Sequence, residues 1–104
     1  MCERGIRTFE DYCRNTLALS VVPALKRISH LPIIVDPSHA TGHQYLIEPM
    51  SLAAVAAGAD GLLLEVHPDP EHALTDAAQQ VDIAQFQRIM QRLRRIAEAV
   101  DRSL

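Results

Sequence analysis

Two short runs of apolar residues stand out in the hydrophobic pattern of the chain. Leu31–Val35 contains three β-branched residues and no polar one, and Leu62–Leu64 is a run of three leucines. Neither run alternates with polar residues, which is typical of strands buried on both faces of a parallel sheet. We therefore expect two buried strands, with a third strand truncated just before Cys2.

Three further segments have the spacing of amphipathic helices, and two of them lie in the first half of the chain. One covers residues 21–29 and follows Ser20, whose hydroxyl can cap a helix. Another covers residues 45–57 or 47–57 and is followed by Gly58, which can adopt the left-handed conformation that ends a helix. The pattern predicts a turn, residues 36–42, between the first strand and this second helix.

The last helix begins at Asp82. The Asp82 carboxylate can cap the helix while the side chain of Gln85 reaches back, as in a capping box. Its predicted inner stripe consists of Ile83, Phe86, Ile89, Met90 and Leu93. Strands and helices thus alternate along the chain, which predicts an α/β fold of right-handed βαβ units around a parallel sheet. A sheet of two or three parallel strands leaves unpaired edges, so we interpret the chain as part of a larger structure.

Length and charge limit the function classes. The 104 residues are 48% hydrophobic and carry a formal net charge of -3, which suits one small globular domain spanning 1–104. The acidic balance argues against nucleic-acid binding, and we interpret Arg92, Arg94 and Arg95 as a solvated helix face. The sequence shows no membrane-spanning run and no signal-peptide core, so we expect a cytoplasmic protein. Cys2 and Cys13 form no metal or disulfide motif.

Residues with metal-binding side chains follow both predicted strands. His39 comes shortly after Leu31–Val35, Glu65 comes directly after Leu62–Leu64, and Asp76 follows in a polar stretch. In parallel α/β folds, ligands gather outside the carboxyl ends of the strands. The pattern therefore indicates one shared metal site and favours an enzyme.

Each candidate has an alternative interpretation. A histidine after a strand more often caps a loop than binds a metal, and Asp76 could cap a helical turn at Ala77. Glu65 is harder to explain without a cation, because an unpaired carboxylate at a buried strand end is costly. His67 is either another ligand, a donor behind the ligands, or a histidine that precedes a proline turn. Asp36 is a candidate for orienting His39 or for proton transfer.

Several ordered motifs together resemble a known enzyme family. They are Cys2–Glu10, Arg14–Leu17, Asp36–Gly42, Ala57–Gly61, Glu65–Pro68 and Ala73–Asp76. Their residues and spacing resemble the C-terminal part of the type I 3-deoxy-7-phosphoheptulonate (DAHP) synthases, over nearly the whole chain. The resemblance implies a (β/α)8 TIM barrel of which this chain supplies about the last three βα units.

The resemblance also implies an activity and a cofactor. Members of the family are transferases that condense phosphoenolpyruvate with erythrose 4-phosphate, the first step of the shikimate pathway to aromatic amino acids. They use a divalent metal held by a Cys, a His, a Glu and an Asp. The last three match His39, Glu65 and Asp76, whereas the family's Cys comes from near the first barrel strand and Cys2 does not replace it. A set of this composition suits Mn, Fe, Co or Zn.

The same family assigns one substrate contact to this chain. Its Glu-Arg-Gly motif binds phosphoenolpyruvate through the arginine, which implies this role for Arg4. The segments that grip the substrate phosphates lie upstream in the family and have no counterpart here, so we expect the chain by itself to be inactive. Gly42-His43-Gln44 and Ala77-Ala78-Gln79-Gln80 depart from the usual family pattern in the substrate loops.

Two alternatives stay open. A related sugar-acid synthase, such as 3-deoxy-octulosonate 8-phosphate synthase, shares the Glu-Arg-Gly motif and the ligand scheme. The chain could also be a non-catalytic barrel fragment that forms a homo-oligomer or pairs with an N-terminal half, which would cover its open sheet edges.

Overall fold

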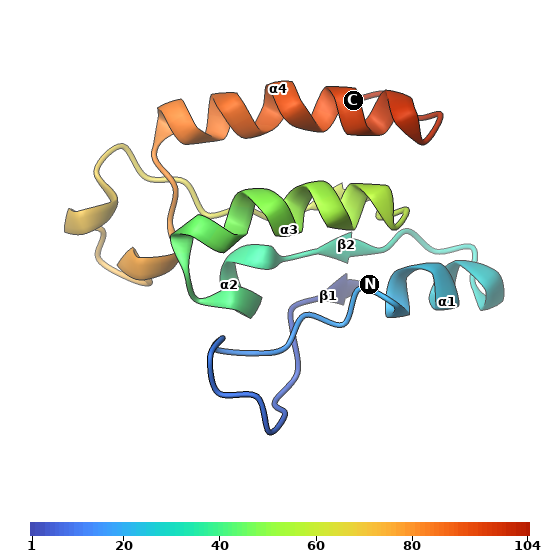
Figure 1. Cartoon of the computed structure of the whole chain (residues 1–104), viewed down its shortest axis with the longest axis horizontal. Coiled ribbons are helices and arrows are strands. Elements are labelled where there is room, and N and C mark those ends of the chain that lie inside the picture. The colour runs from blue at the N-terminus through green and yellow to red at the C-terminus, as the bar shows by residue number, and fades with distance from the viewer.

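Strands and helices alternate along the chain, as the hydrophobic pattern predicts. We describe a computed structural model that covers residues 1–104. The elements are β1 (Cys2–Glu3), α1 (Val21–Ile28), β2 (Ile34–Val35), α2 (Pro37–Thr41), α3 (Gln44–Ala56), β3 (Gly61–Leu62), the 3-10 turns η1 (Pro70–His72) and η2 (Ala77–Gln79), and α4 (Ile83–Ala99) (Figure 1). None of these helices combines the length and the apolar character that a bilayer crossing requires.

The three strands form one parallel sheet in the order β1-β2-β3. Ile34 is the partner of Cys2 on one side and of Gly61 on the other. The predicted α/β class and parallel sheet are confirmed. The truncated first strand lies at Cys2–Glu3 instead of ending before Cys2. Both edge strands, β1 and β3, have one unpaired side.

The core lies between the sheet and the helices. Its first part joins α1, the sheet and α3 and consists of Val22, Ile33, Val35, Ala54 and Ala59. Its second part lies between α3 and α4 and consists of Ile47, Val81, Ile89 and Leu93. Figure 1 shows α4 lying along α3, with the strands beyond α3. The helices that the periodicity predicts are therefore the ones that bury the core.

Burial of the strands on both faces is wrong for this chain. Ile33 and Val35 are buried against the helices, but Ile34 between them is 40% exposed. Successive side chains of a strand point to opposite faces, so Ile34 lies on the face that no helix covers. Leu63, directly after β3, is likewise exposed. A continuous apolar run thus marks a sheet with one covered and one open face here.

The segment between β2 and α3, predicted as a turn, contains the five-residue helix α2. Asp36 precedes this helix, and its Oδ1 accepts a hydrogen bond of 3.0 Å from the backbone N–H of His39. Pro37 occupies the first helical position, where its missing N–H costs nothing. Gly42 ends the helix with φ of 70°, a left-handed conformation that glycine adopts without strain. These capping signals are local, and they outweigh the shortness of the segment.

The ends of the longer helices follow the predictions in part. Gly58 has the predicted left-handed φ of 103° after α3, and the capping box of Asp82 and Gln85 is present at α4. Ser20 lies at the N-cap position of α1, but its side chain makes no capping hydrogen bond. Ile83 is 51% exposed instead of facing inward, because it lies in the first turn of α4, before the helix packs on α3.

The carboxylate of Asp60, which directly precedes β3, connects three segments at the amino end of the sheet. Asp60 accepts hydrogen bonds from Lys26 Nζ at 2.8 Å, the backbone N–H of Ile33 at 2.9 Å and Arg102 Nη2 at 2.9 Å. The Lys26 hydrogen bond contributes most to holding the pKa of Asp60 well below its usual range, followed by the bonds from Ile33 and Arg102. These contacts attach α1 and the residues after α4 to the strand ends.

Replacement of Asp60 should reduce stability in a pH-dependent way. Because the pKa of Asp60 is lower in the folded than in the unfolded chain, its charge stabilises the fold above about pH 4 and this contribution fades as the pH falls toward the folded pKa. We expect Asp60→Asn to lower the free energy of unfolding by about 1–3 kcal/mol at pH 7 and to flatten its decline between about pH 5 and pH 2. Urea unfolding across this range, with the exposed Asp11→Asn as control, measures both effects. A loss of stability that is the same at every pH would contradict the assignment.

Candidate metal centre

The three predicted metal ligands come together at the carboxyl end of the sheet. His39 lies on α2 after β2, Glu65 follows β3, and Asp76 precedes η2. One nitrogen or oxygen atom from each lies within 4.8 Å of the others. His39 Nε2 contacts Glu65 Oε1 and lies 3.6 Å from Asp76 Oδ2. Convergence of parallel strands at one edge thus produces the cluster that the strand-end pattern predicts; its role as a ligand set stays a prediction.

Asp36 fixes the ring of His39. Its carboxylate is fully buried, and Asp36 Oδ2 lies 2.7 Å from His39 Nδ1 while Oδ1 accepts from the His39 backbone N–H. A buried carboxylate accepts hydrogen bonds, so the Nδ1 atom carries a proton and donates it to Asp36. In neutral imidazole the lone pair is then on Nε2, the atom that faces Glu65 and Asp76. This orientation matches the way in which metal-bound histidines are commonly held.

The side chains present fit a divalent cation. With the Nδ1 proton donated to Asp36, the Nε2 lone pair of His39 and the Oε1 atom of Glu65 are two acceptors in contact, an arrangement that a proton or a cation must relieve. Ligand bonds of about 2.0–2.2 Å place neighbouring ligand atoms about 3–4 Å apart. The 3.6 Å between His39 Nε2 and Asp76 Oδ2 lies in this range, and all three candidate ligand atoms lie within 4.8 Å of one another. One imidazole and two carboxylates suit Mn, Fe, Co or Zn.

Arg4 is attached to the same buried carboxylate. Its Nε donates to Asp36 Oδ2 at 2.9 Å, while its side chain is 53% exposed. The terminal Nη atoms make no hydrogen bond within the protein. The planar guanidinium therefore presents free donors to solvent beside the cluster, as a group that binds an anionic substrate would do.

The structure also bears on the alternative interpretations of Asp76 and His67. Asp76 occupies the N-cap position of η2, but its side chain makes no capping hydrogen bond, so the capping alternative is wrong. His67 lies outside the cluster, and its Nδ1 accepts a hydrogen bond of 2.9 Å from the backbone N–H of Asp69. Any role of His67 in metal binding or behind the ligands stays a prediction.

The sequence analysis missed residues that hold the cluster in place. Ser38 is fully buried, and its Oγ accepts a hydrogen bond from the backbone N–H of Glu65 at 3.1 Å, which joins α2 to the end of β3. Arg14 Nη1 lies 3.5 Å from Asp76 Oδ1 and donates to Gln79 Oε1 at 3.0 Å. A serine before the histidine gave a weak signal for the first contact, and nothing local indicated the second.

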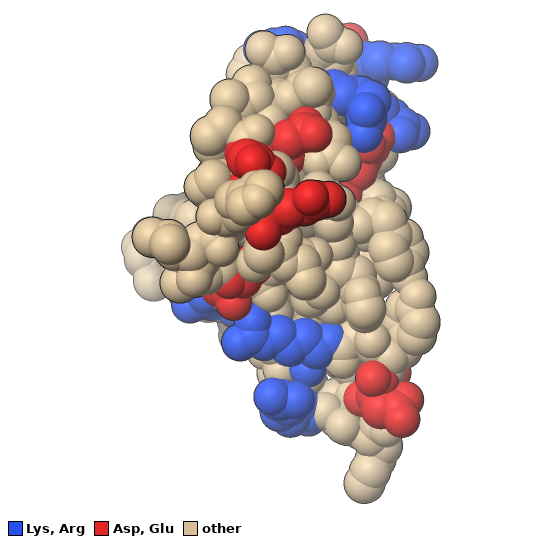
Figure 2. All heavy atoms as spheres, turned by 90° about the vertical axis from the view of Figure 1, so that its left-hand side faces the viewer, with Lys and Arg blue, Asp and Glu red and all other residues tan.

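Acidic and basic side chains form neighbouring groups at this end of the molecule. Figure 2 looks onto the side where the loops after the strands gather and shows acidic side chains grouped together, with Lys and Arg side chains next to them. Two ion pairs lie at the carboxyl end of the sheet, Arg4 with the buried Asp36 and Arg14 with Asp76. The rim can therefore hold a cation and an anion side by side.

Comparison with known proteins decides the family. A sequence model of the DAHP synthetase I family matches residues 1–102. The chain belongs to this family. It is 51% identical over 100 residues to a phospho-2-dehydro-3-deoxyheptonate aldolase from Thermotoga maritima, a match that covers 96% of this chain and 30% of the relative. A 2-dehydro-3-deoxyphosphooctonate aldolase from Desulfotalea psychrophila is 35% identical over 86 residues, which cover 72% of this chain and 31% of the relative.

Solved structures agree with this result. A truncated 3-deoxy-D-arabino-heptulosonate 7-phosphate synthase from Thermotoga maritima superimposes with a TM-score of 0.96 at 50% identity, covering 98% of this chain and 39% of that one. A structure of the DAHP synthase of the same organism gives the same TM-score. This match covers 98% of our chain and 30% of the synthase chain. The DAHP synthetase I chain described here thus spans about a third of the length of the relatives it matches.

Loss of the Asp36 carboxylate should weaken metal binding. We expect Asp36→Asn to lower the affinity for Mn²⁺ or Co²⁺ by about 10–100-fold, because the amide neither holds the Nδ1 proton of His39 as well nor raises the basicity of Nε2. Asp69→Asn is a matched control, since Asp69 pairs with the exposed His72 at the same spacing of three residues. Titration against a competing chelator measures the affinities; equal values for both variants would exclude Asp36 from the site.

Proposed function

We propose that this chain forms the carboxyl-terminal part of a 3-deoxy-7-phosphoheptulonate synthase, which condenses phosphoenolpyruvate with erythrose 4-phosphate and releases phosphate. The observation that carries this proposal is the convergence of His39, Glu65 and Asp76 at the carboxyl end of the parallel sheet. Membership of the DAHP synthetase I family and the 51% identity to the Thermotoga relative support the choice of substrates.

His39, Glu65 and Asp76 would hold a divalent cation, Mn, Fe, Co or Zn, together with a cysteine that the family supplies from elsewhere. When bound, such a cation acts as a Lewis acid that polarises the aldehyde oxygen of the acceptor sugar. The buried carboxylate of Asp36 keeps the proton on Nδ1 of His39, so that Nε2 is free to coordinate. Glu65 and Asp76 supply the negative charge that offsets the cation.

Arg4 would bind the donor substrate. Its guanidinium carries a permanent positive charge, and its Nε bond to Asp36 leaves the Nη donors free for the anionic groups of phosphoenolpyruvate. Because Arg4 and His39 share the Asp36 carboxylate, the donor would be fixed next to the cation. Orientation of the two reactants is a large part of what a site of this kind can contribute.

We also propose that the sheet is a segment of a closed (β/α)8 barrel. Both of its edges are unpaired, one face is uncovered, and Ile34 and Leu63 are exposed on or beside it. Further strands would pair with these edges and enclose the open face. By itself the chain would have half a site, and it would associate with another copy or with the remaining part of a synthase.

The octulosonate synthase alternative is less well supported. The Desulfotalea aldolase, a relative named for the octulosonate reaction, is 35% identical, compared with 51% for the heptulonate enzyme of Thermotoga. Both groups keep the same proposed ligands by resemblance, so the difference concerns the acceptor sugar. Assays with erythrose 4-phosphate and arabinose 5-phosphate distinguish the two.

A hybrid enzyme tests the proposal. The part of the Thermotoga relative that precedes the matched region is fused to, or co-expressed with, this chain, and phosphate release from the two substrates is measured with added Mn²⁺. We expect metal-dependent turnover that EDTA abolishes. His39→Ala and Glu65→Ala should lose more activity than the roughly 10–100-fold that loss of a supporting group costs. His72→Ala, an exposed histidine, is the control.

Two outcomes would contradict the proposal. Unchanged rates in the His39→Ala and Glu65→Ala variants would remove the metal centre, and a folded hybrid without turnover would favour a non-catalytic fragment. In an active hybrid, Arg4→Lys should raise the KM for phosphoenolpyruvate more than that for erythrose 4-phosphate. A rise confined to erythrose 4-phosphate would reassign Arg4.

A further inference from the structure

The long loop between β1 and α1 is attached to the helix that carries His39. The backbone N–H of Arg14 donates to Thr41 O at 3.1 Å, and that of Asn15 donates to Ala40 O at 2.7 Å. A methyl group added to Gly42 would lie only 2.8 Å from the Cβ of Arg14, so the two backbones pack closely. The position of Arg14 is therefore set by α2.

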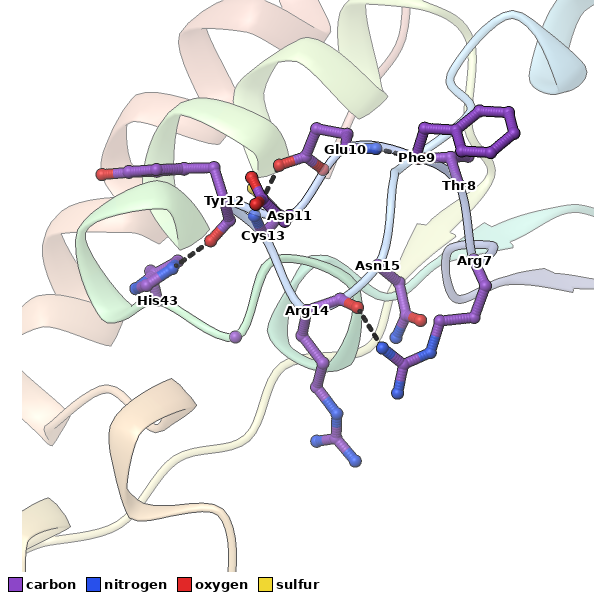
Figure 3. Close-up of a pocket in the computed structure, with 11 residues that line it drawn as sticks. Arg7, Thr8, Phe9, Glu10, Asp11, Tyr12, Cys13, Arg14, Asn15 and His43 are labelled. Carbon is purple, nitrogen blue, oxygen red and sulfur yellow. Dashed lines mark hydrogen bonds between the residues drawn. The ribbon is translucent and has the colours of Figure 1, made fainter.

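From this fixed backbone, the Arg14 side chain reaches across to the third ligand segment. Figure 3 shows the side chains of Arg7 and Arg14 extending from the loop to the same side, with Arg7 bonded to the Arg14 carbonyl. Arg14 Nη1 donates to Gln79 Oε1 at 3.0 Å and lies 3.5 Å from Asp76 Oδ1. Gln79 is buried, and its Nε2 has no hydrogen-bond partner. Arg14 is thus the only group bonded to the Gln79 side chain.

Asp76 needs such a partner more than the other ligands do. It has a φ of 50°, a left-handed conformation in a residue other than glycine, and Leu74 close by is fully exposed. His39 is held by buried Asp36, and the backbone of Glu65 by buried Ser38, whereas Asp76 has no buried side chain bonded to its carboxylate. Its Oδ1 faces Arg14, and its Oδ2 faces His39 Nε2.

We propose that Arg14 is a positioning residue that holds Asp76 and its turn in the ligating orientation and so couples the β1–α1 loop to the metal centre. This inference rests on the proposed function, because it takes Asp76 as a ligand. Arg14 binds one carboxylate oxygen and leaves the other directed at the site, while its bond to Gln79 anchors the guanidinium. Simple charge repulsion from Arg14 would have the opposite effect, since its removal would then strengthen cation binding.

Cobalt binding to the full chain tests this role. Co²⁺ affinity is measured by chelator competition, and the visible spectrum reports the coordination. We expect Arg14→Ala to bind about 10–100-fold more weakly and to shift the spectrum toward that of Asp76→Asn. In the Asp76→Asn background, Arg14→Ala should have little further effect, because the two residues act as one unit. Arg14→Lys should recover part of the affinity.

Arg27→Ala, an exposed arginine on α1 without an ion pair, is the charge-matched control, and we expect its affinity within about twofold of wild type. Unchanged or tighter binding in Arg14→Ala, an equal loss in Arg27→Ala, or an undiminished loss in the Asp76→Asn background would each overturn the proposal. If the wild-type chain binds no Co²⁺, or His39→Ala binds as wild type does, the metal centre itself is wrong. If His39→Ala abolishes binding and Arg14→Ala does not alter it, only the role of Arg14 is wrong.

Discussion

The buried carboxylate of Asp36 organises the carboxyl end of the sheet. A fully buried negative charge is tolerated only with strong partners, and Asp36 has three, namely the backbone N–H and Nδ1 of His39 and the Nε of Arg4. The first starts α2, the second sets the histidine tautomer, and the third places a guanidinium from β1 beside the site. One side chain thus determines local secondary structure, the orientation of the candidate ligand His39 and the position of Arg4, for which we propose substrate binding.

The surrounding fold supplies the rigid support that such a carboxylate needs. Val35, directly before Asp36, is buried in the core with Val22 and Ala54, so the end of β2 cannot shift without disturbing the packing of α1 and α3. Ser38 connects α2 to the end of β3. The elements on the helix side of the sheet are well packed, whereas the opposite face and both edges are open. Close packing on one side of the sheet therefore coexists with an open face and open edges on the other.

Sequence reasoning could locate part of this site because parallel strands end at one edge. His39 and Glu65 each follow an apolar run closely, so their convergence follows from the strand order. Arg14 and Asp76 are 62 positions apart, and no local pattern indicates their contact. The capping box of Asp82 was predictable because its signals lie within four residues, and helix α2 was missed because a five-residue segment carries too little periodicity. Exposure of Ile34 depends on which face of the sheet the helices cover, which an apolar run does not encode.

The central claim is that His39, Glu65 and Asp76 bind one divalent cation. Crystals grown with Mn²⁺ and measured for anomalous scattering test it most directly. The account predicts one strong anomalous peak about 2.0–2.3 Å from His39 Nε2 and from an oxygen of each carboxylate, with Nδ1 still bonded to Asp36. A peak at another place, or none while the imidazole of His39 turns away from both carboxylates, would contradict it.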